Sequence, residues 1–154
     1  AAVVLTGAPD GNRGRLQAEP ANLFRYLLSI PGEVLVSEAG CRVVASTGEW
    51  PGRPTDAEAT VALDGDLVRG PLTVRNRRPG DRFQPPGMAG HKRVQDLFVD
   101  RKVPRAERDR VPIVVDADDR VVWVAGHGVD AAFQPRAGTK AVIFLRIELL
   151  GGLA

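Results

Sequence analysis

Proline and glycine divide this 154-residue chain into short apolar segments. The sequence holds 17 Gly and 12 Pro, and Val and Ile recur in the segments between them. β-Branched residues favour strands and Pro-Gly pairs favour tight turns, so this pattern indicates many short strands rather than a helical bundle. We therefore predict a mainly β (α+β) protein that is interrupted once by a short helical hairpin.

Apolar and β-branched runs bounded by turn residues mark the strands, and two of them, 72–77 and 140–150, also alternate apolar and polar residues. The clearest strand is 140–150, in which Ala141, Ile143, Leu145, Ile147 and Leu149 share one face. Further strands are predicted at 3–5, 23–30, 33–37, 41–47, 59–63, 67–68, 72–77, 111–116 and 120–125.

The helical hairpin is predicted between these strands. Val94, Leu97 and Phe98 fall at helical spacing in a first helix that starts near His91. Pro104 suits the first position of a second helix, which Pro112 ends. We expect one domain with an uncertain extension at 1–20, a β-rich half at 21–74, a basic turn and helical hairpin at 75–112, and closing strands at 113–150.

Positive charge is concentrated in the segment Arg75–Arg110. This segment carries eleven of the 21 basic residues and five of the 19 acidic ones, a local balance of +6 in a chain of net charge +2. The remainder therefore holds 10 basic and 14 acidic residues. A surface of that kind usually meets an anion, most often a nucleic acid.

Composition narrows the class of protein. Hydrophobic residues make up 44% and charged residues 26%, as in ordinary soluble proteins, and no apolar run approaches the roughly 20 residues of a membrane span. The single Cys41 cannot form an internal disulfide, so we expect a cytoplasmic protein. Because the chain begins without Met, we also expect it to be a piece of a longer protein.

Catalytic, nucleotide and metal motifs are missing from the sequence. It contains no P-loop, and the G-x-G-x-x-A match at 126–131 lacks room for a following helix because of Pro135. His91 and His127 are far apart and have no Cys or His nearby, which argues against zinc. We interpret His127 as a loop residue and Cys41 as a small core residue.

The basic segment is left as the functional candidate. Lys92 and Arg93 are expected at the start of a helix, where cations oppose the helix dipole and so do little for stability. Arg105 and Arg108 should share one face of the second helix. The alternative is a solvated face whose cations pair with the neighbouring acids, namely Asp96, Asp100, Glu107 and Asp109.

A set of motifs runs through this segment in a fixed order. They are Arg-Arg-Pro-Gly-Asp-Arg-Phe at 77–83, Gly-Met-Ala-Gly at 87–90, the helix start at 92–99, Val-Pro-Arg with a closing Pro at 103–112, and Val-Trp-Val-Ala-Gly at 122–126. This co-linear set resembles the C-terminal domain of bacterial tRNA(Ile)-lysidine synthetase. The stretch 28–34 resembles the start of that domain's β-region more loosely.

The resemblance implies a fold and a function. The family's domain is a β-sandwich, similar to a module of the phenylalanyl-tRNA synthetase β subunit, and it helps to hold tRNA(Ile) by its acceptor stem. The full enzyme joins lysine to the wobble cytidine, using ATP with Mg, in an N-terminal PP-loop domain marked by Ser-Gly-Gly-x-Asp-Ser. That motif does not occur in this chain. The implied partners are tRNA(Ile) and the N-terminal catalytic domain, and no cofactor is expected in this chain itself.

Residue roles follow from these two lines of reasoning. Alternation should place Arg75 and Arg77 on an exposed face, and Phe83 and Met88 are expected to plug the core beneath the loop. Predicted tRNA contacts are Arg75, Arg77, Arg78, Arg82, Lys92, Arg93, Lys102, Arg105 and Arg108, with Pro79, Gly80 and Asp81 forming a structural turn and no catalytic residue or metal ligand. The alternative function is a protein-interaction or dimerisation module that docks on its own catalytic domain or another subunit.

Overall fold

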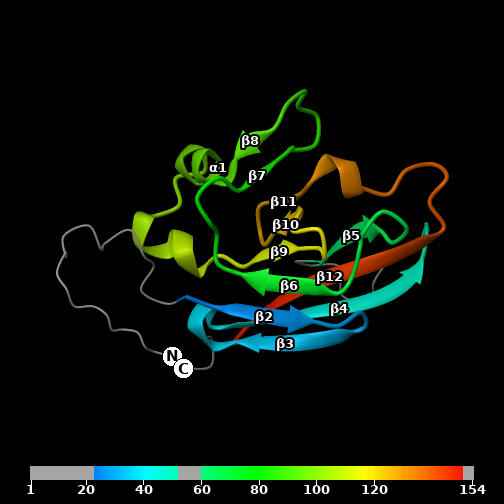
Figure 1. Ribbon diagram of the computed structural model, residues 1–154, viewed down its shortest axis with the longest axis horizontal. Helices are drawn as coiled ribbons and strands as arrows, with labels where there is room; N and C mark the ends of the chain where they lie inside the picture. The colour runs from blue at the N-terminus through cyan, green and yellow to red at the C-terminus, as the bar shows by residue number, and fades with distance from the viewer. Residues whose placement is uncertain (1–22, 52–59, 151–154) are drawn as a thin grey trace.

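Two β-sheets and an outer layer make up the protein in a computed structural model, which describes residues 23–51 and 60–150 (Figure 1). The five-stranded sheet has the order β11-β10-β9-β6-β2, and the four-stranded sheet has the order β3-β4-β12-β5. The first comprises β2 (Arg25–Leu28), β6 (Leu72–Arg75), β9 (Ile113–Val115), β10 (Val121–Val124) and β11 (Gly128–Val129). The second comprises β3 (Gly32–Val36), β4 (Cys41–Glu49), β5 (Thr60–Asp64) and β12 (Ala141–Leu149).

The outer layer is the predicted basic segment. It consists of the two-stranded ribbon β7 (Arg82–Phe83) and β8 (Lys92–Arg93), helix α1 (Val94–Asp100) and the 3₁₀ helix η4 (Arg105–Arg110). Two further 3₁₀ helices, η3 (Ser37–Ala39) and η5 (Ala131–Phe133), lie in connections. In Figure 1 the ribbon and α1 lie above the five-stranded sheet, on the side away from β3 and β4.

The main hydrophobic core lies between the two sheets. Strand β12 pairs along its whole length with β4, from Ala141 opposite Glu49 to Leu149 opposite Cys41. Its side chains Ile143 and Leu145 pack there with Trp123 of the other sheet. Cys41 is buried in this core, as predicted. The fold is therefore a β-sandwich.

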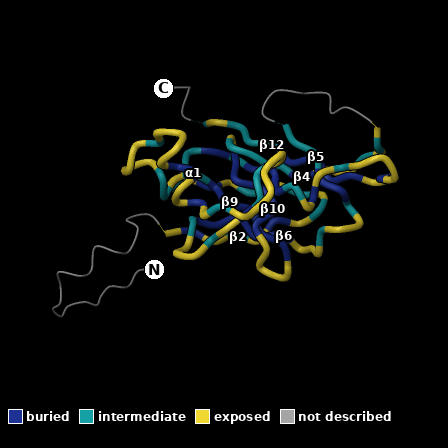
Figure 2. Tube along the Cα trace, turned by 90° about the horizontal axis from the view of Figure 1, so that it is seen from above, coloured by how far each residue is buried: buried dark blue, intermediate teal, exposed yellow. Residues whose placement is uncertain are grey.

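A second, smaller core attaches the outer layer to the five-stranded sheet. Phe83, Val94, Leu97 and Phe98 pack from the layer against sheet residues that include Ile113. As a result β6, β9 and β10 are buried on both faces (Figure 2). These strands lie between the main core and the smaller core and therefore have no solvent-facing side.

Most predicted strands are confirmed with shifted ends, and some local predictions are wrong. The second helix is a 3₁₀ helix that begins after Pro104. Lys92 and Arg93 form strand β8, and Arg93 is also the N-cap of α1, so the two residues directly precede that helix, as predicted. Met88 is exposed, whereas Phe83 is buried as expected. The predicted strand 3–5 and the extension 1–20 lie outside the described residues.

Two further properties concern the described parts of the chain alone. No helix in residues 23–51 or 60–150 is long and apolar enough to cross a membrane. The same two ranges hold no group of three His, Cys, Asp or Glu side chains arranged to bind a metal ion.

Candidate nucleic-acid interface

A tight turn, Arg78–Asp81, leads from the five-stranded sheet into the outer layer. The backbone N–H of Asp81 donates to the carbonyl of Arg78 at 3.0 Å, and the N–H of Arg78 donates to Asp81 Oδ2 at 2.7 Å. Gly80 has φ +91°, a conformation that favours glycine. The carbonyl of Asp81 also accepts from the N–H of Val94 at 2.9 Å, so the turn is tied to the start of α1.

Beneath this turn lies a buried ion pair. Arg75 Nη1 and Nη2 donate to the two carboxylate oxygens of Asp81 at 2.9 and 3.0 Å, and Nη1 also donates to the carbonyl of Asn76 at 2.8 Å. The two side chains are only 3% and 10% exposed. The predicted exposure of Arg75 is therefore wrong, and its predicted phosphate contact is corrected to a structural contact. Its strand face is covered by the outer layer that the same segment forms.

The adjacent residues fasten η4 to the sheet. Arg77 Nε donates to Asp109 Oδ1 at 2.9 Å, and its guanidinium carbon lies 5.9 Å from the centre of the Phe98 ring. The buried Asn76 side chain accepts from the N–H of Phe24 and donates to the carbonyl of Asp109. Arg77 is therefore partly engaged in holding the layer together.

Several predicted cations are exposed and have no partner for their side chains within the described residues. These are Arg82, Arg93, Lys102 and Arg105. Arg82 and Arg93 stand directly opposite each other across the β7–β8 ribbon. Like charges in that position repel each other, and no carboxylate among the described residues pairs with either of these two side chains.

The remaining predicted cations are partly engaged. Lys92 pairs with Asp100, and Arg108 Nε donates to the carbonyl of Val103 at 2.9 Å. Arg78 lies 3.9 Å from Asp119, beyond hydrogen-bonding distance. Pairing with neighbouring acids thus accounts for some of the cations of the segment, and the rest remain available to an external anion.

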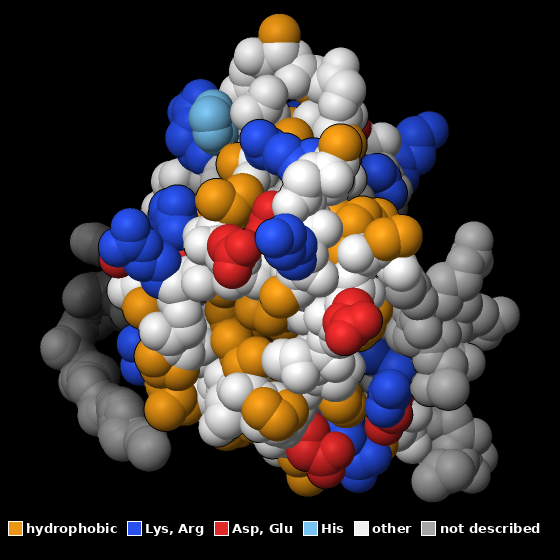
Figure 3. Space-filling view, turned by 90° about the vertical axis from the view of Figure 1, so that its right-hand side faces the viewer, with side chains coloured by type: hydrophobic (Ala, Val, Ile, Leu, Met, Phe, Trp, Pro, Cys, Tyr) orange, Lys and Arg blue, Asp and Glu red, His pale blue; other side chains and the backbone are white. Residues whose placement is uncertain are grey.

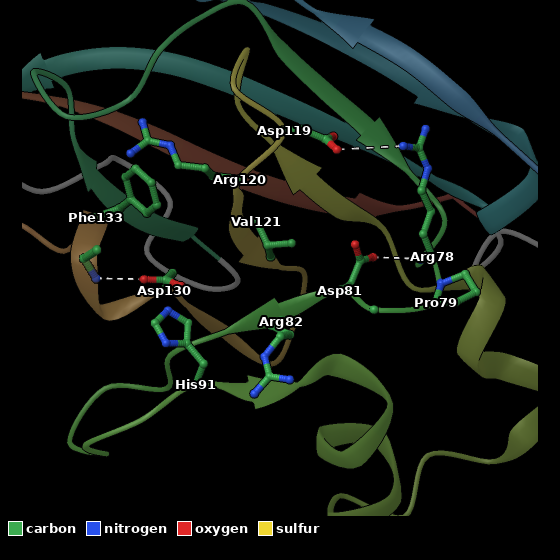
Figure 4. A pocket seen from close by; sticks show the side chains of 12 residues that line it. Arg78, Pro79, Asp81, Arg82, His91, Asp119, Arg120, Val121, Asp130 and Phe133 are labelled. Carbon is green, nitrogen blue, oxygen red and sulfur yellow. Dashed lines mark hydrogen bonds and ion pairs between the residues drawn. The ribbon is translucent and has the colours of Figure 1, made fainter.

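Two hollows lie on the ribbon side and the α1 side of the Arg78–Asp81 turn. The larger, of about 460 Å³, lies between the turn, the ribbon and η5; Arg78, Arg82 and His91 line it, together with Arg120 (Figure 4). The smaller, of about 250 Å³, lies on the α1 side and is lined by Arg77 and Arg93 among others. Figure 3 shows the face on the right-hand side of the view of Figure 1, where Lys and Arg side chains lie mostly on the upper half, the end of the molecule that carries the outer layer.

The turn between β9 and β10 is organised by a fully buried carboxylate. Burial alone would raise the pKa of Asp116, but hydrogen bonds from the Arg120 side chain, at 3.0 and 2.6 Å, and from three backbone N–H groups outweigh burial and lower it. The same pairing raises the pKa of Arg120, whose guanidinium carbon lies 4.9 Å from the centre of the Phe133 ring. Arg120 is thus fixed as a cation at the rim of the larger hollow.

His127 packs against α1 of the outer layer and lines neither of these two hollows. Its ring packs edge-on against Phe98, with 5.4 Å between ring centres, and its Nδ1 is buried without a partner in the described structure. Burial, and to a smaller extent Arg101, lowers the pKa of His127. This packing agrees with the interpretation of His127 as a loop residue rather than a base.

Comparison with known proteins identifies the family. A family model described as "TilS substrate C-terminal domain" matches residues 72–148. A solved structure described as "Crystal structure of TILS C-terminal domain" superposes with a TM-score of 0.73 at 32% identity, covering 84% of this chain and 98% of that one. The chain belongs to the TilS substrate C-terminal domain family.

Relatives of the TilS family extend this match. A tRNA(Ile)-lysidine synthase of Symbiobacterium thermophilum is 45% identical over 124 residues, which cover 79% of this chain and 25% of the relative. One from Geobacillus kaustophilus is 36% identical over 127 residues, covering 82% and 27%. The chain therefore spans about a quarter of the length of these curated relatives.

Some residues around the turn were not predicted from the sequence. Arg25, Asp119 and Arg120 line hollows beside the turn but lie outside the basic segment. Arg25 reaches this region because β2 pairs with β6, which sets it directly opposite Arg75. No local pattern signals that pairing, because β3, β4 and β5 come between β2 and β6 in the sequence.

Proposed function

We propose that this domain binds tRNA(Ile) for a tRNA(Ile)-lysidine synthetase, holding the acceptor stem against its outer layer. The observation that carries the proposal is the set of exposed cations without partners on that layer, Arg82, Arg93, Lys102 and Arg105. Unpaired like charges cost stability, so their presence is explained better by an anionic partner than by folding. The names of the relatives support tRNA as that partner.

The chemistry of the proposed contact is with phosphate groups. Arginine guanidinium groups suit bidentate contacts to phosphate oxygens, and such contacts follow the shape of an RNA stem without reading its bases. Arg78, Lys92 and Arg108 would add to the contact by exchanging their weak or exposed partners for phosphates. Arg77 would contribute less, since it also holds Asp109.

We propose that the ligation of lysine takes place in a separate domain of the enzyme. We infer that an N-terminal PP-loop domain uses ATP with Mg to join lysine to the wobble cytidine, in the cytoplasm. This chain would then hold and orient the tRNA. Its own residues would take no part in the chemical step.

The salt dependence of tRNA affinity tests the proposal. Phosphate contacts release counterions, so the logarithm of the affinity should fall linearly with the logarithm of the salt concentration. We expect weak binding of tRNA(Ile) by the isolated chain that declines steeply between about 50 and 200 mM salt. Binding that is absent or independent of salt would exclude the proposal.

A charge-matched pair of variants locates the surface. The double variant Arg82→Ala/Arg93→Ala removes two cations of the outer layer and should weaken binding at least tenfold, with a lower salt slope. The control, Arg136→Ala/Lys140→Ala, removes two exposed cations from the connection before β12, and their side chains also have no partner in the described residues. Equal losses from both doubles would point to non-specific attraction.

The alternative function, a docking module, can be tested with the same isolated chain and the same variants. If the basic layer docks on a protein surface or a second copy, the wild-type chain should form dimers in light scattering or bind the separate catalytic domain. Both interactions should then depend on Arg82 and Arg93, while tRNA affinity should not.

A further inference from the structure

We propose a second phosphate-binding site, beside the outer layer, in the hollow between β2, β6 and the β9–β10 turn. This hollow has a volume of about 420 Å³. Arg25, Arg75 and Arg78 line it from three different elements, together with Thr73 and Asp119. The ligand is a phosphoryl group of the RNA backbone, so the site rests on the proposed tRNA-binding function and extends its surface onto β2.

The register of the sheet places two arginines side by side at this site. Arg25 of β2 pairs directly opposite Arg75 of β6, so both side chains point to the same face of the sheet. Arg75 is occupied by Asp81 below the turn. Arg25 is exposed, and its side chain has no partner within the described residues.

Arg78 closes the hollow from the side of the turn. Its side chain is 49% exposed, and its nearest carboxylate is Asp119, at 3.9 Å (Figure 4). Asp119 Oδ1 is also 3.9 Å from Arg75 Nη2. Both distances exceed a hydrogen bond, so Asp119 attracts the two guanidinium groups without satisfying either of them.

The balance of charge favours an anion here. Asp116 also lines the hollow, but its carboxylate is fully buried and bonded to Arg120, as Arg75 is bonded to Asp81. These two pairs leave Arg25 and Arg78 against the single carboxylate of Asp119. A phosphate between the two arginines would receive charge-assisted hydrogen bonds that Asp119 does not receive.

Asp119 acts in this site as a competitor for the ligand. Its side chain is 66% exposed and its backbone has φ 63°, a conformation that Asn also adopts readily. Binding of phosphate requires this carboxylate to turn away or to tolerate the repulsion. Removing its charge should therefore tighten RNA binding.

The first test compares two single arginine variants in tRNA binding. Arg25→Ala should weaken affinity about tenfold and lower the salt slope by about one. Arg136→Ala removes another exposed arginine whose side chain has no partner in the described structure, and it should change affinity less than twofold. Thermal unfolding of both variants checks that each remains folded.

The second test uses two neighbouring aspartates. Asp119→Asn should tighten tRNA binding severalfold, whereas Asp118→Asn makes the same change in net charge one residue away and should tighten it less than twofold. Asp118 is a matched control because it lies near Arg69 and Arg120, at 3.6 and 4.0 Å, and does not line this hollow.

The outcomes separate this site from the proposed function. If Arg82→Ala/Arg93→Ala abolishes salt-dependent binding while Arg25→Ala and Asp119→Asn behave like their controls, the second site is wrong and tRNA binding stands. If no variant alters tRNA binding, both proposals fail.

A titration of the chain with inorganic phosphate, followed by NMR at the Arg25 and Arg78 amides, shows whether free phosphate alone occupies the hollow. Shifts that are as large in Arg25→Ala as in the wild type would also count against the site.

Discussion

Removing one partner of the buried Arg75–Asp81 pair should lower the free energy of unfolding far more than replacing both partners. Replacing Asp81 by Ala leaves the Arg75 guanidinium, 3% exposed, without its carboxylate. Breaking a buried pair in this way typically costs about 3–5 kcal/mol. We take the lower end, about 3 kcal/mol, because Nη1 keeps its bond to the carbonyl of Asn76.

The size of the expected change makes the assay simple. For a chain of this length, about 3 kcal/mol corresponds to a fall in Tm of about 10 °C. Urea unfolding at neutral pH should show the same loss of free energy. The double variant Arg75→Met/Asp81→Ala removes both charges and should lie within about 1 kcal/mol of the wild type.

A partly exposed carboxylate gives the control. Glu148, 34% exposed, pairs with Arg146 at 2.5 Å and with Arg42 at 2.9 Å. Glu148→Ala should therefore cost about 1 kcal/mol or less. The reasoning is refuted if Asp81→Ala costs no more than Glu148→Ala, or if the double variant is as unstable as Asp81→Ala.

Two further predictions concern the β9–β10 turn and the outer core. The pKa of Asp116 is lowered in the folded state, so its contribution to stability is present above the unfolded pKa of about 3.9 and is lost as pH falls through the folded pKa. Asp116→Asn should cost about 1–2 kcal/mol at pH 7 and flatten the fall in urea-unfolding free energy below about pH 4; an unchanged acid profile would contradict this. Phe98→Ala should cost about 3–5 kcal/mol, because the ring is fully buried, whereas Val99→Ala, at a site 51% exposed, should stay within about 0.5 kcal/mol. Similar losses for the two in thermal unfolding would show that the outer core contributes little.

The sheet scaffold could be predicted because its signal is local. Alternation of apolar and polar residues located β12, apolar and β-branched runs located β4 and β10 to within a few residues, and the apolar spacing of Val94, Leu97 and Phe98 located α1. The predicted concentration of cations also corresponds to one layer of the structure. The prediction of which strand faces are exposed to solvent was wrong.

Arg75 illustrates that failure. Alternation correctly set its side chain on the face away from the sandwich core, but that face is covered by residues that follow it in the chain. The β7–β8 ribbon was missed because each of its strands has only two residues, too few for any periodicity. Arg25 was missed because its place depends on pairing between strands far apart in sequence.

The attachment of the outer layer has a consequence for heat and denaturant. Only four of the eight buried residues in the smaller core belong to the layer, Phe83, Val94, Leu97 and Phe98, while the sandwich has a larger core of its own. Units with fewer buried contacts open at lower free energy than the whole molecule. We therefore expect the layer to detach while the sandwich stays folded, and the proposed RNA binding would then fail before the protein melts. Fluorescence of Trp123, which is buried between the two sheets, would report the later event.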